Sequence, residues 1–533
     1  MPDPDDRPHL PSLSRRTLLG GAAAGVALAS LGMAPGFGVP AASGTSATPT
    51  LTIDPGDRLG RIGIRALGFS FEKSTLATPL FQASNTDLVA LFRLLGPGVL
   101  RLGGNSVDRT DWDPSGAGST PGVVAPPDLA GLRGFLDAVD WQVLYGTPFV
   151  STGASAATVA DEAHTAAGVL GARLDGVELC NEPDLFAANP AHAALAGTFS
   201  LFQSRWNSFA AAVRAATPGI ALTGPACCLL QTIGTWTAPF AGAESGGLSQ
   251  LTQHYYRGFG GPGQTIDLLL APDPLLGPSL DALAAAAGVA GAPAGFRLTE
   301  TNSFASGGQP GVSNTFASAL WAVEHVLRSL EGGAVGLNLH NSGTGAGYPA
   351  LVQQGGVVTE IRPLYLGLLL AARLGTGDLV ATSPSTPLPS LRSHAVHGAD
   401  GTIRVVLVNV DPTIDQPLSL SLPRTIGSAT VERLTGDGLA ATTGTRLGGS
   451  DVGVDGSFEP GPPEVVGGGP ARATLAVTVA AASAVVVAIT LEPTATPSTT
   501  TTTAGHTGSS TTVAPTGPAP AALPVTAEPR YTG

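Results

Sequence analysis

The sequence predicts an α/β protein in which a (β/α)8 TIM barrel is followed by a smaller antiparallel β-sandwich domain. Between residues 60 and 374, short strands rich in Val, Leu and Ile alternate with helical stretches, and eight such units are typical of the barrel. From residue 375 to 492 the segments are short, β-branched and separated by Gly, Pro and Asp, as in an antiparallel sandwich. The hydrophobic fraction of 43% is enough to build both cores.

Apolar runs bounded by turn residues predict the eight barrel strands, and helical periodicity between them predicts the outer layer, for example at Phe199–Ala216 and Thr315–Leu330. A doubly wound open sheet is the alternative. Against it, Gly68-Phe69-Ser70 lacks the GxGxxG spacing of a phosphate-binding loop. The predicted strands are Leu67–Glu72, Val99–Leu102, Pro148–Thr152, Gly176–Cys180, Ile220–Gly224, Leu251–Tyr255, Phe296–Glu300 and Val335–His340.

The sandwich is expected to include a strand that precedes the barrel in the sequence. Segments such as Thr402–Val410 and Ala484–Leu491 are the clearest strands after the barrel. The N-terminal segment 42–59 holds a further short apolar run at Thr50–Ile53, which we expect to join the same sheet. The second domain would then be discontinuous in sequence.

Both ends of the chain read as non-globular segments. Arg15 and Arg16 precede an Ala/Gly-rich run, and Val39-Pro40-Ala41 offers a small-residue cleavage site, so residues 1–41 resemble a twin-arginine signal peptide. A membrane anchor is the alternative, but the run is short and broken by Gly. Residues 493–533 are rich in Thr, Ser, Pro and Ala and are expected to be disordered. We expect a secreted protein that uses the export machinery, with retention at the cell surface left open.

Charge and cysteine content exclude several classes of protein. The formal net charge is −13, from 39 acidic and 26 basic residues, and the only lysine is Lys73. Because no basic stripe can neutralise phosphates, we expect no nucleic-acid partner. The 3 cysteines include the adjacent pair Cys227 and Cys228, which rules out a disulfide framework and zinc-ligand spacing. Buried free thiols are expected, while a disulfide between Cys180 and Cys227 stays open.

Polar residues gather where the predicted barrel strands end, which is the rim that carries chemistry in this fold. Any one of them would be a capping or surface residue, but together they indicate a site. Glu182 and Glu300 follow the fourth and seventh strands, and two carboxylates there suit a double displacement at the anomeric carbon of a sugar. Arg101 and Tyr256 are candidate donors to Glu300, and Asn181 is placed to bind a sugar 2-hydroxyl.

The rim segments resemble glycoside hydrolase family 79, the β-glucuronidase and heparanase family of the clan A retaining glycosidases. The resemblance covers about Thr50 to Leu491 and includes the Asn-Glu-Pro at 181–183. The other matching segments are Leu67-Gly68-Phe69-Ser70-Phe71-Glu72, Leu100-Arg101-Leu102-Gly103-Gly104-Asn105-Ser106-Val107-Asp108, Gln253-His254-Tyr255-Tyr256-Arg257, Glu300-Thr301-Asn302-Ser303 and Gly345-Ala346-Gly347-Tyr348.

The resemblance implies an enzyme that removes terminal β-linked glucuronic or 4-O-methylglucuronic acid. Glu182 would be the acid/base and Glu300 the nucleophile. The glycan or glucuronide is the implied partner, and no metal or organic cofactor is implied. The implied substrate-binding residues are Glu72, Asn105, Asp108, Asn181, His254 and Tyr256 around the sugar, with Tyr348 and backbone amides near Gly347 for the uronate carboxylate.

One departure leaves the sugar open. Members of the family carry a Tyr five residues past the nucleophile, where this chain has Ala305. A β-xylosidase, an arabinofuranosidase or a non-catalytic surface glycan-binding protein are the alternatives, and the presence of both glutamates disfavours the last. Exo or endo action and the oligomeric state are not indicated by the sequence.

Overall fold

The computed structural model describes residues 48–341, 347–467 and 472–493. The expected signal peptide at 1–41 and, apart from Pro493, the expected tail lie outside the described residues, as does Gly345. Among the residues that are described, none of the helices is long and apolar enough to cross a membrane.

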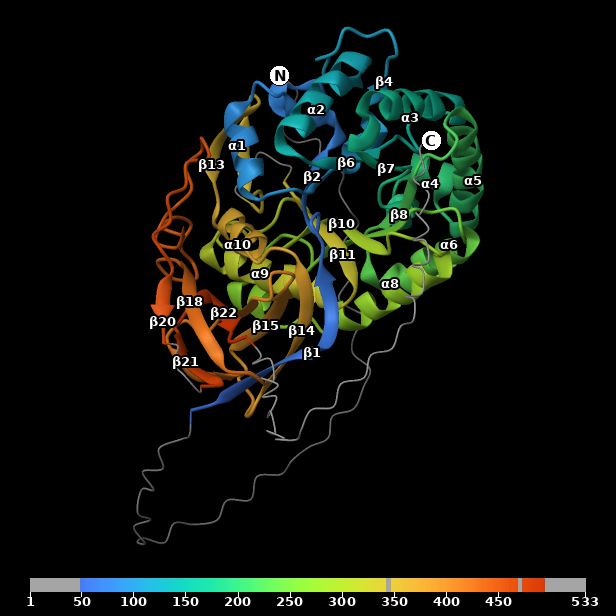
Figure 1. Ribbon diagram of the computed structural model, residues 1–533. Coiled ribbons are helices and arrows are strands. Elements are labelled where there is room, and N and C mark those ends of the chain that lie inside the picture. The colour runs from blue at the N-terminus through green and yellow to red at the C-terminus, as the bar shows by residue number, and fades with distance from the viewer. Residues whose placement is uncertain (1–47, 342–346, 468–471, 494–533) are drawn as a thin grey trace, which may run out of the picture. The chain divides into compact units, whose positions relative to one another are not determined.

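Eight parallel strands close into a barrel, which confirms the predicted fold class (Figure 1). Their side chains are almost all buried because the inner face packs on itself and the outer face packs under helices. In ring order the strands are β2 (Leu67–Glu72), β3 (Val99–Gly103), β6 (Gln142–Gly146), β7 (Leu174–Glu178), β8 (Leu222–Cys227), β9 (Gln250–Tyr256), β10 (Phe296–Asn302) and β11 (Ala334–His340).

The third barrel strand was predicted in the wrong place. The strand is β6, whose Val143 pairs with Leu100 of β3, whereas the predicted segment Pro148–Thr152 forms the loop that follows it. Phe149 and Val150 are buried, but their backbone amides bind the Asp108 carboxylate at 2.6 and 2.7 Å instead of a neighbouring strand. A buried apolar loop therefore has the same local sequence pattern as a strand.

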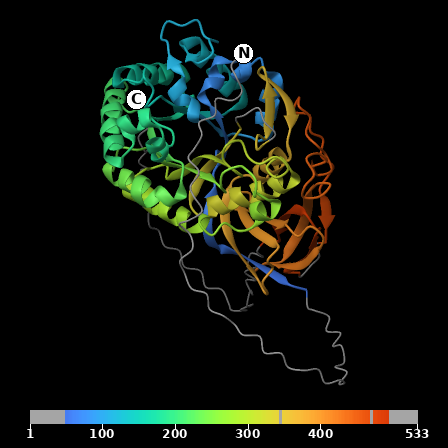
Figure 2. The same cartoon turned by 180° about the vertical axis from the view of Figure 1, so that it is seen from behind.

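Helices form an outer layer around the barrel strands in both views (Figures 1 and 2). Side chains cap several of them at the start: Asn85, Ser155 and Thr198 each accept a hydrogen bond from a backbone N–H of the first turn. The helices are α1 (Thr86–Leu94), α2 (Pro126–Val139), α3 (Ala156–Leu170), α4 (Pro190–Ala196), α5 (Phe199–Ala216), α6 (Ala238–Ala243), α7 (Ile266–Leu270), α8 (Leu276–Ala290), α9 (Phe316–Glu331) and α10 (Pro363–Ala372).

Short 3-10 helices follow four of the barrel strands and shape the rim. They are η1 (Lys73–Ala77) after β2, η3 (Asn105–Arg109) after β3, η5 (Pro183–Ala188) after β7 and η6 (Leu230–Thr232) after β8. Two further strand pairs, β4 (Asp111–Trp112) with β5 (Val123–Val124) and β12 (Leu351–Gln354) with β13 (Val357–Ile361), lie in the connections of the barrel.

The second domain is a ten-stranded sheet that encloses its own apolar core. Strand β1 pairs antiparallel with β14 along its length and parallel with β17 at its start, so the segment before the barrel joins the sheet that follows it. Leu51 and Ile53 of β1 share that core with residues of β16 and β22. The strands are β1 (Thr50–Ile62), β14 (Gly377–Pro384), β15 (Leu391–Gly398), β16 (Ile403–Asn409), β17 (Gln416–Ser421), β18 (Ile426–Thr435), β19 (Arg446–Leu447), β20 (Glu464–Val466), β21 (Thr474–Val479) and β22 (Ser483–Leu491).

An ionic contact joins the sheet to the barrel. His394 of β15 is buried, and its Nδ1 and Nε2 atoms lie 2.7 Å from Glu331 and 2.6 Å from Glu324, both on α9. Burial would lower the pKa of His394, but the two carboxylates outweigh it and raise the pKa to about 10. The imidazolium is therefore the stable form of this side chain at neutral pH.

Candidate active site

A cavity of about 690 Å³ opens at the C-terminal ends of the barrel strands. The ends of seven of the eight barrel strands, or the segments that follow them, supply its wall, so residues far apart in sequence meet there. The lining residues are Glu72, Ser74, Asn105, Ser106, Arg109, Glu182, Leu185, Cys228, Tyr256, Phe259, Glu300, Ala305, Ser306, Gly307, His340 and Tyr348.

Glu300, on β10, is held by donors on both carboxylate oxygens. Arg101 Nη1 lies 2.5 Å from Oε2, and the Tyr256 hydroxyl donates to Oε1 at 2.7 Å. His340 Nδ1 lies 3.6 Å from Oε2. Burial would raise the pKa of Glu300, but the charges of His340, His254 and Arg101 and the Tyr256 hydrogen bond hold it well below its usual range. Glu300 is thus an ionised carboxylate at neutral pH.

Arg101 is fully buried on β3 and connects four side chains at the base of the cavity. Besides Glu300 it donates to Glu178 at 2.8 Å, to Asn181 Oδ1 at 2.8 Å and to Ser70 Oγ at 3.2 Å. Burial would lower the pKa of Arg101, but Glu178 and Glu300 raise it above its ordinary value. The sequence analysis did not single out Glu178, although an acidic residue inside an otherwise apolar barrel strand is a signal for a buried ion pair.

Glu182 is positioned by an unusual backbone conformation. It follows β7 at the start of η5 with φ +51° and ψ 53°, in the left-handed region that non-glycine residues rarely occupy. Its backbone N–H donates to the Ala226 carbonyl at 2.9 Å, and its Oε1 lies 3.0 Å from His254 Nδ1. The other ring nitrogen of His254 is buried without a partner among the described residues. Strain of this kind is concentrated at functional sites.

The two glutamates face each other across the cavity. One carboxylate oxygen of Glu182, one of Glu300 and a ring nitrogen of His254 all lie within 4.8 Å of one another. These three donors could in principle surround a cation. However, Arg101 and Tyr256 already bind the oxygens of Glu300, and the guanidinium supplies positive charge where an ion would sit.

The structure places the remaining predicted residues in several environments. Glu72 and Asn105 line the cavity, with Glu72 Oε2 accepting from the Ser106 backbone N–H at 2.6 Å. Asn181 lies behind Asn105, whose Oδ1 accepts from the Asn181 Nδ2 at 3.4 Å. Tyr348 also lines the cavity, and its ring centroid lies 6.1 Å from that of Tyr256.

Asp108 and Gly347 are not among the described residues that line the cavity. The Asp108 carboxylate accepts hydrogen bonds from the loop after β6, as described above. The Gly347 carbonyl accepts from Arg362 at 2.8 Å, and a Cβ at Gly347 would lie 1.5 Å from the Gly307 carbonyl oxygen. Glycine is therefore required there for two loops to pack, and its predicted amide contact with a substrate remains a prediction.

The loop after β10 supplies lining residues that the sequence analysis missed. Ser306, Gly307 and Gly308 have φ values of +60°, +89° and +88°, and the Gly307 carbonyl accepts from the Tyr348 N–H at 3.0 Å. The Ser-Gly-Gly triplet was the available signal. Three left-handed residues in a row turn this loop back over the cavity.

The three cysteines are unpaired thiols. Cys180 and Cys227 are fully enclosed by the protein, and burial raises the pKa of both. Cys228 lines the cavity next to Glu182. The disulfide left open from the sequence does not form between Cys180 and Cys227.

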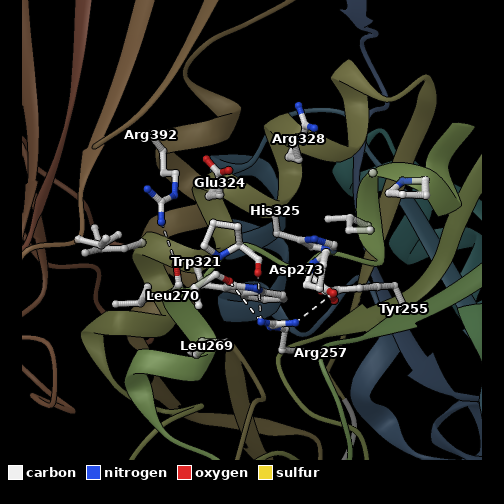
Figure 3. A pocket seen from close by; sticks show the side chains of 18 residues that line it. Tyr255, Arg257, Leu269, Leu270, Asp273, Trp321, Glu324, His325, Arg328 and Arg392 are labelled. Carbon is white, nitrogen blue, oxygen red and sulfur yellow. Dashed lines mark hydrogen bonds and ion pairs between the residues drawn. The ribbon is translucent and has the colours of Figure 1, made fainter. Parts of the chain in front are cut away.

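A second cavity, of about 270 Å³, lies outside the barrel wall, between α7, α8 and α9 (Figure 3). Arg257 Nη1 lies 3.1 Å from Asp273, which also accepts from the Tyr255 hydroxyl at 2.8 Å. His325 stacks between Tyr255 and Trp321 with centroid distances of 4.7 Å. Neither glutamate of the rim lines this cavity, so the rim cavity is the candidate active site.

Solved structures of several glycoside hydrolases are similar to this chain. A 4-O-α-L-rhamnosyl-β-D-glucuronidase from Fusarium oxysporum matches with a TM-score of 0.66 at 19% identity, covering 82% of this chain and 99% of its own. A family 51 arabinofuranosidase from Xanthomonas axonopodis pv. citri matches with a TM-score of 0.60 at 14% identity, covering 83% and 99%. A family 44 xyloglucanase from Paenibacillus polymyxa matches with a TM-score of 0.57 at 11% identity, covering 84% and 100%.

The chain therefore shares the barrel-plus-sheet fold of these enzymes over nearly their whole length. No family model matches the sequence. No curated protein matches it either.

Proposed function

We propose that the protein is a retaining glycoside hydrolase with Glu300 as nucleophile and Glu182 as acid/base. The observation that carries the proposal is the pairing of these carboxylates, with oxygens within 4.8 Å of each other and only Glu300 bound by a guanidinium and a phenol. Such a close approach of one oxygen from each carboxylate is in keeping with the short carboxyl separation, roughly 5–5.5 Å, of retaining enzymes.

The reaction needs two displacements at the anomeric carbon. A Glu300 oxygen attacks C1 while the bond from C1 to the leaving oxygen breaks, and that oxygen takes the proton of Glu182. The resulting Glu182 carboxylate then removes a proton from water, whose oxygen attacks C1 and releases the Glu300 carboxylate. His254, 3.0 Å from Glu182, orients the acid for both proton transfers.

The proposed substrate is a β-linked glucuronic acid at a chain end. The Fusarium oxysporum enzyme is, by its name, a β-D-glucuronidase for a sugar that carries a 4-O-α-L-rhamnosyl group. The resemblance of the rim segments to family 79 supports this sugar. Local donors also support it: the Tyr348 hydroxyl and the Ser306–Gly307 loop line the cavity and can bind a carboxylate without a cluster of cations. Glu72 and Asn105 are proposed to bind hydroxyls.

An arabinofuranosidase is the second candidate. Ala305 lines the cavity where family 79 members carry a Tyr, which removes one contact to the sugar, and the fold likeness extends to family 51 arabinofuranosidases. Because residues 1–41 resemble a twin-arginine signal, we also place the enzyme outside the cytoplasm.

Hydrolysis of p-nitrophenyl β-D-glucuronide by the wild type, Glu300→Gln and Glu182→Gln tests the proposal. Glu300→Gln should abolish release of nitrophenol. Glu182→Gln should keep more activity, because nitrophenolate leaves with little help from an acid. The matched control is Glu459→Gln, an exposed glutamate of the sheet domain, which should behave as wild type.

The stereochemistry of the first product separates the two mechanisms. A retaining enzyme releases the β-anomer of the sugar first, which ¹H NMR detects before mutarotation. An α-anomer would contradict the nucleophilic role of Glu300. Absence of turnover with the glucuronide but turnover of p-nitrophenyl α-L-arabinofuranoside would replace the proposed sugar by the second candidate.

A further inference from the structure

A third cavity, of about 220 Å³, adjoins the candidate active site. It shares Cys228, Tyr256, Phe259 and Ala305 with the active-site cavity, so the two spaces meet at these side chains. Its remaining wall comes from the loops after β8 and β9 and from the start of α8, and consists of Leu229, Leu230, Gln231, Arg257, Gly258, Asp273 and Leu275.

The wall of this third cavity combines four accessible apolar side chains with polar residues such as Gln231. Phe259 is 50% exposed and Leu275 is 46% exposed, which are large values for apolar side chains beside an active site. Leu229 and Leu230 are half-buried on the same wall. Its charged members are already engaged with each other, because Arg257 pairs with Asp273 at 3.1 Å. The accessible leucine and phenylalanine side chains therefore offer a ligand a hydrophobic contact surface.

The order of strands around the barrel shows on which side of the glutamates this cavity lies. Glu182 follows β7 and Glu300 lies on β10, so β8 and β9 separate them on one side of the ring, and β11, β2, β3 and β6 on the other. The longer side carries the hydrogen-bonding groups of the active-site cavity: Glu72, Ser74, Asn105, Ser106 and His340. The hydroxyls of a sugar need such partners. The third cavity lies on the shorter side, where Leu229, Leu230, Phe259 and Leu275 are exposed or half-buried.

The segment that carries Glu182 is hydrogen-bonded to the loop after β8, on the shorter side of the ring. Asp184, two residues after Glu182, accepts hydrogen bonds from the backbone N–H groups of Cys228 and Leu229 at 2.8 and 3.0 Å. The oxygen that Glu182 protonates must therefore lie close to the loop that carries Leu229 and Leu230. Phe259 is fixed opposite that loop, because the Ala305 N–H donates to the Gly258 carbonyl at 2.8 Å.

We propose that the third cavity is the leaving-group subsite and that it takes an apolar, ring-sized aglycone, so that the natural substrates are aryl or arylalkyl glycosides. This inference rests on the proposed hydrolase function. The volume suits one substituted ring, because a cavity of about 150 Å³ lined by apolar side chains already holds benzene. Phe259 and Leu275 both line it.

The test compares two glucuronides whose leaving alcohols have similar acidity and differ in apolar size: methyl and 2-phenylethyl β-D-glucuronide. Burial of the phenyl ring is expected to raise kcat/KM by about 30-fold for the wild type. Leu275→Ser and Leu230→Ser should each reduce this ratio severalfold. Leu268→Ser is the matched control, because Leu268 is 38% exposed on α7 and does not line the third cavity, so the ratio should stay at the wild-type value.

The outcomes separate the two proposals. Cleavage of p-nitrophenyl β-D-glucuronide with equal kcat/KM for the methyl and 2-phenylethyl compounds, or with no turnover of the latter, would overturn the apolar subsite and leave the hydrolase function standing. A glucuronosyl disaccharide that is cleaved faster than the 2-phenylethyl compound would replace the aglycone by a second sugar. Absence of turnover of every glycoside would overturn the hydrolase function and the subsite together.

Discussion

Arg101 Nη1 lies 2.5 Å from Glu300 Oε2, and the same guanidinium binds Glu178 and Asn181. One buried cation therefore keeps the proposed nucleophile ionised while a second carboxylate balances its charge. Because the group is buried, removing its charge would leave two buried carboxylates without this counter-ion, which is costly. The first prediction follows from this shared position.

Substitution of Arg101 by Lys should reduce both activity and stability. A lysine ammonium cannot reach all three partners, so Glu178 or Glu300 loses its counter-charge. We expect kcat to fall by about 100-fold or more and the free energy of unfolding to fall by about 3 kcal/mol. Steady-state kinetics and urea denaturation measure the two effects. Arg58→Lys, at an exposed ion pair with Asp378, should change neither; wild-type kcat in Arg101→Lys would contradict the assigned role.

Substitution of Tyr256 by Phe should move the acid limb of the pH profile. The Tyr256 hydroxyl is one of the groups that lower the pKa of Glu300, so its removal raises that pKa. Since the nucleophile must be ionised, kcat/KM should begin to fall at a higher pH than in the wild type, with kcat about 100-fold lower. Tyr365→Phe removes a buried hydroxyl that donates to Leu91 and should leave the profile unchanged. An unshifted acid limb in Tyr256→Phe would count against the Glu300 assignment.

Substitution of His254 by Ala should affect poor leaving groups more than good ones. His254 binds Glu182 at 3.0 Å and orients it for proton transfer. We expect kcat/KM for methyl β-D-glucuronide to fall about tenfold more than for p-nitrophenyl β-D-glucuronide, because only the alkyl compound needs a positioned acid. An equal loss on both compounds would assign His254 to the nucleophile side of the site. His164→Ala, at an exposed histidine of α3, is the control.

Stability should depend on the charge of His394. Its pKa is raised from 6.5 to about 10 in the folded protein, so its stabilising contribution is complete below pH 6.5 and is lost as the pH rises toward 10. Equilibrium unfolding at pH 6.5 and pH 10 should show this decrease in the wild type. In His394→Gln the free energy of unfolding at pH 6.5 should be lower by about 3 kcal/mol, and the decrease should be smaller. His397→Gln, on the same strand, should keep the wild-type dependence; a wild type with equal stability at both pH values would refute the contact.

Much of the fold was predictable because it depends on local pattern. Seven of the eight barrel strands overlap the segments chosen from apolar runs, and the early strand Thr50–Ile53 lies within β1. The remaining segment, Pro148–Thr152, was wrong because its apolar residues are buried in a loop whose amides bind Asp108, 41 and 42 residues earlier in the chain. No local signal separates that loop from a strand.

The sequence by itself determined the barrel, the rim and the identity of the two rim glutamates, since every strand of a parallel barrel ends at the same rim. Only the tertiary structure decided which side chains meet across that rim. It brought Glu178 into contact with Arg101 and Asp108 into contact with the backbone of the loop after β6. It also brought Leu230 and Leu275 to the wall of one cavity. These relationships depend on strand register and on how loops pack over the ring. Such packing arises between residues distant in the chain, and local propensity carries no information about it.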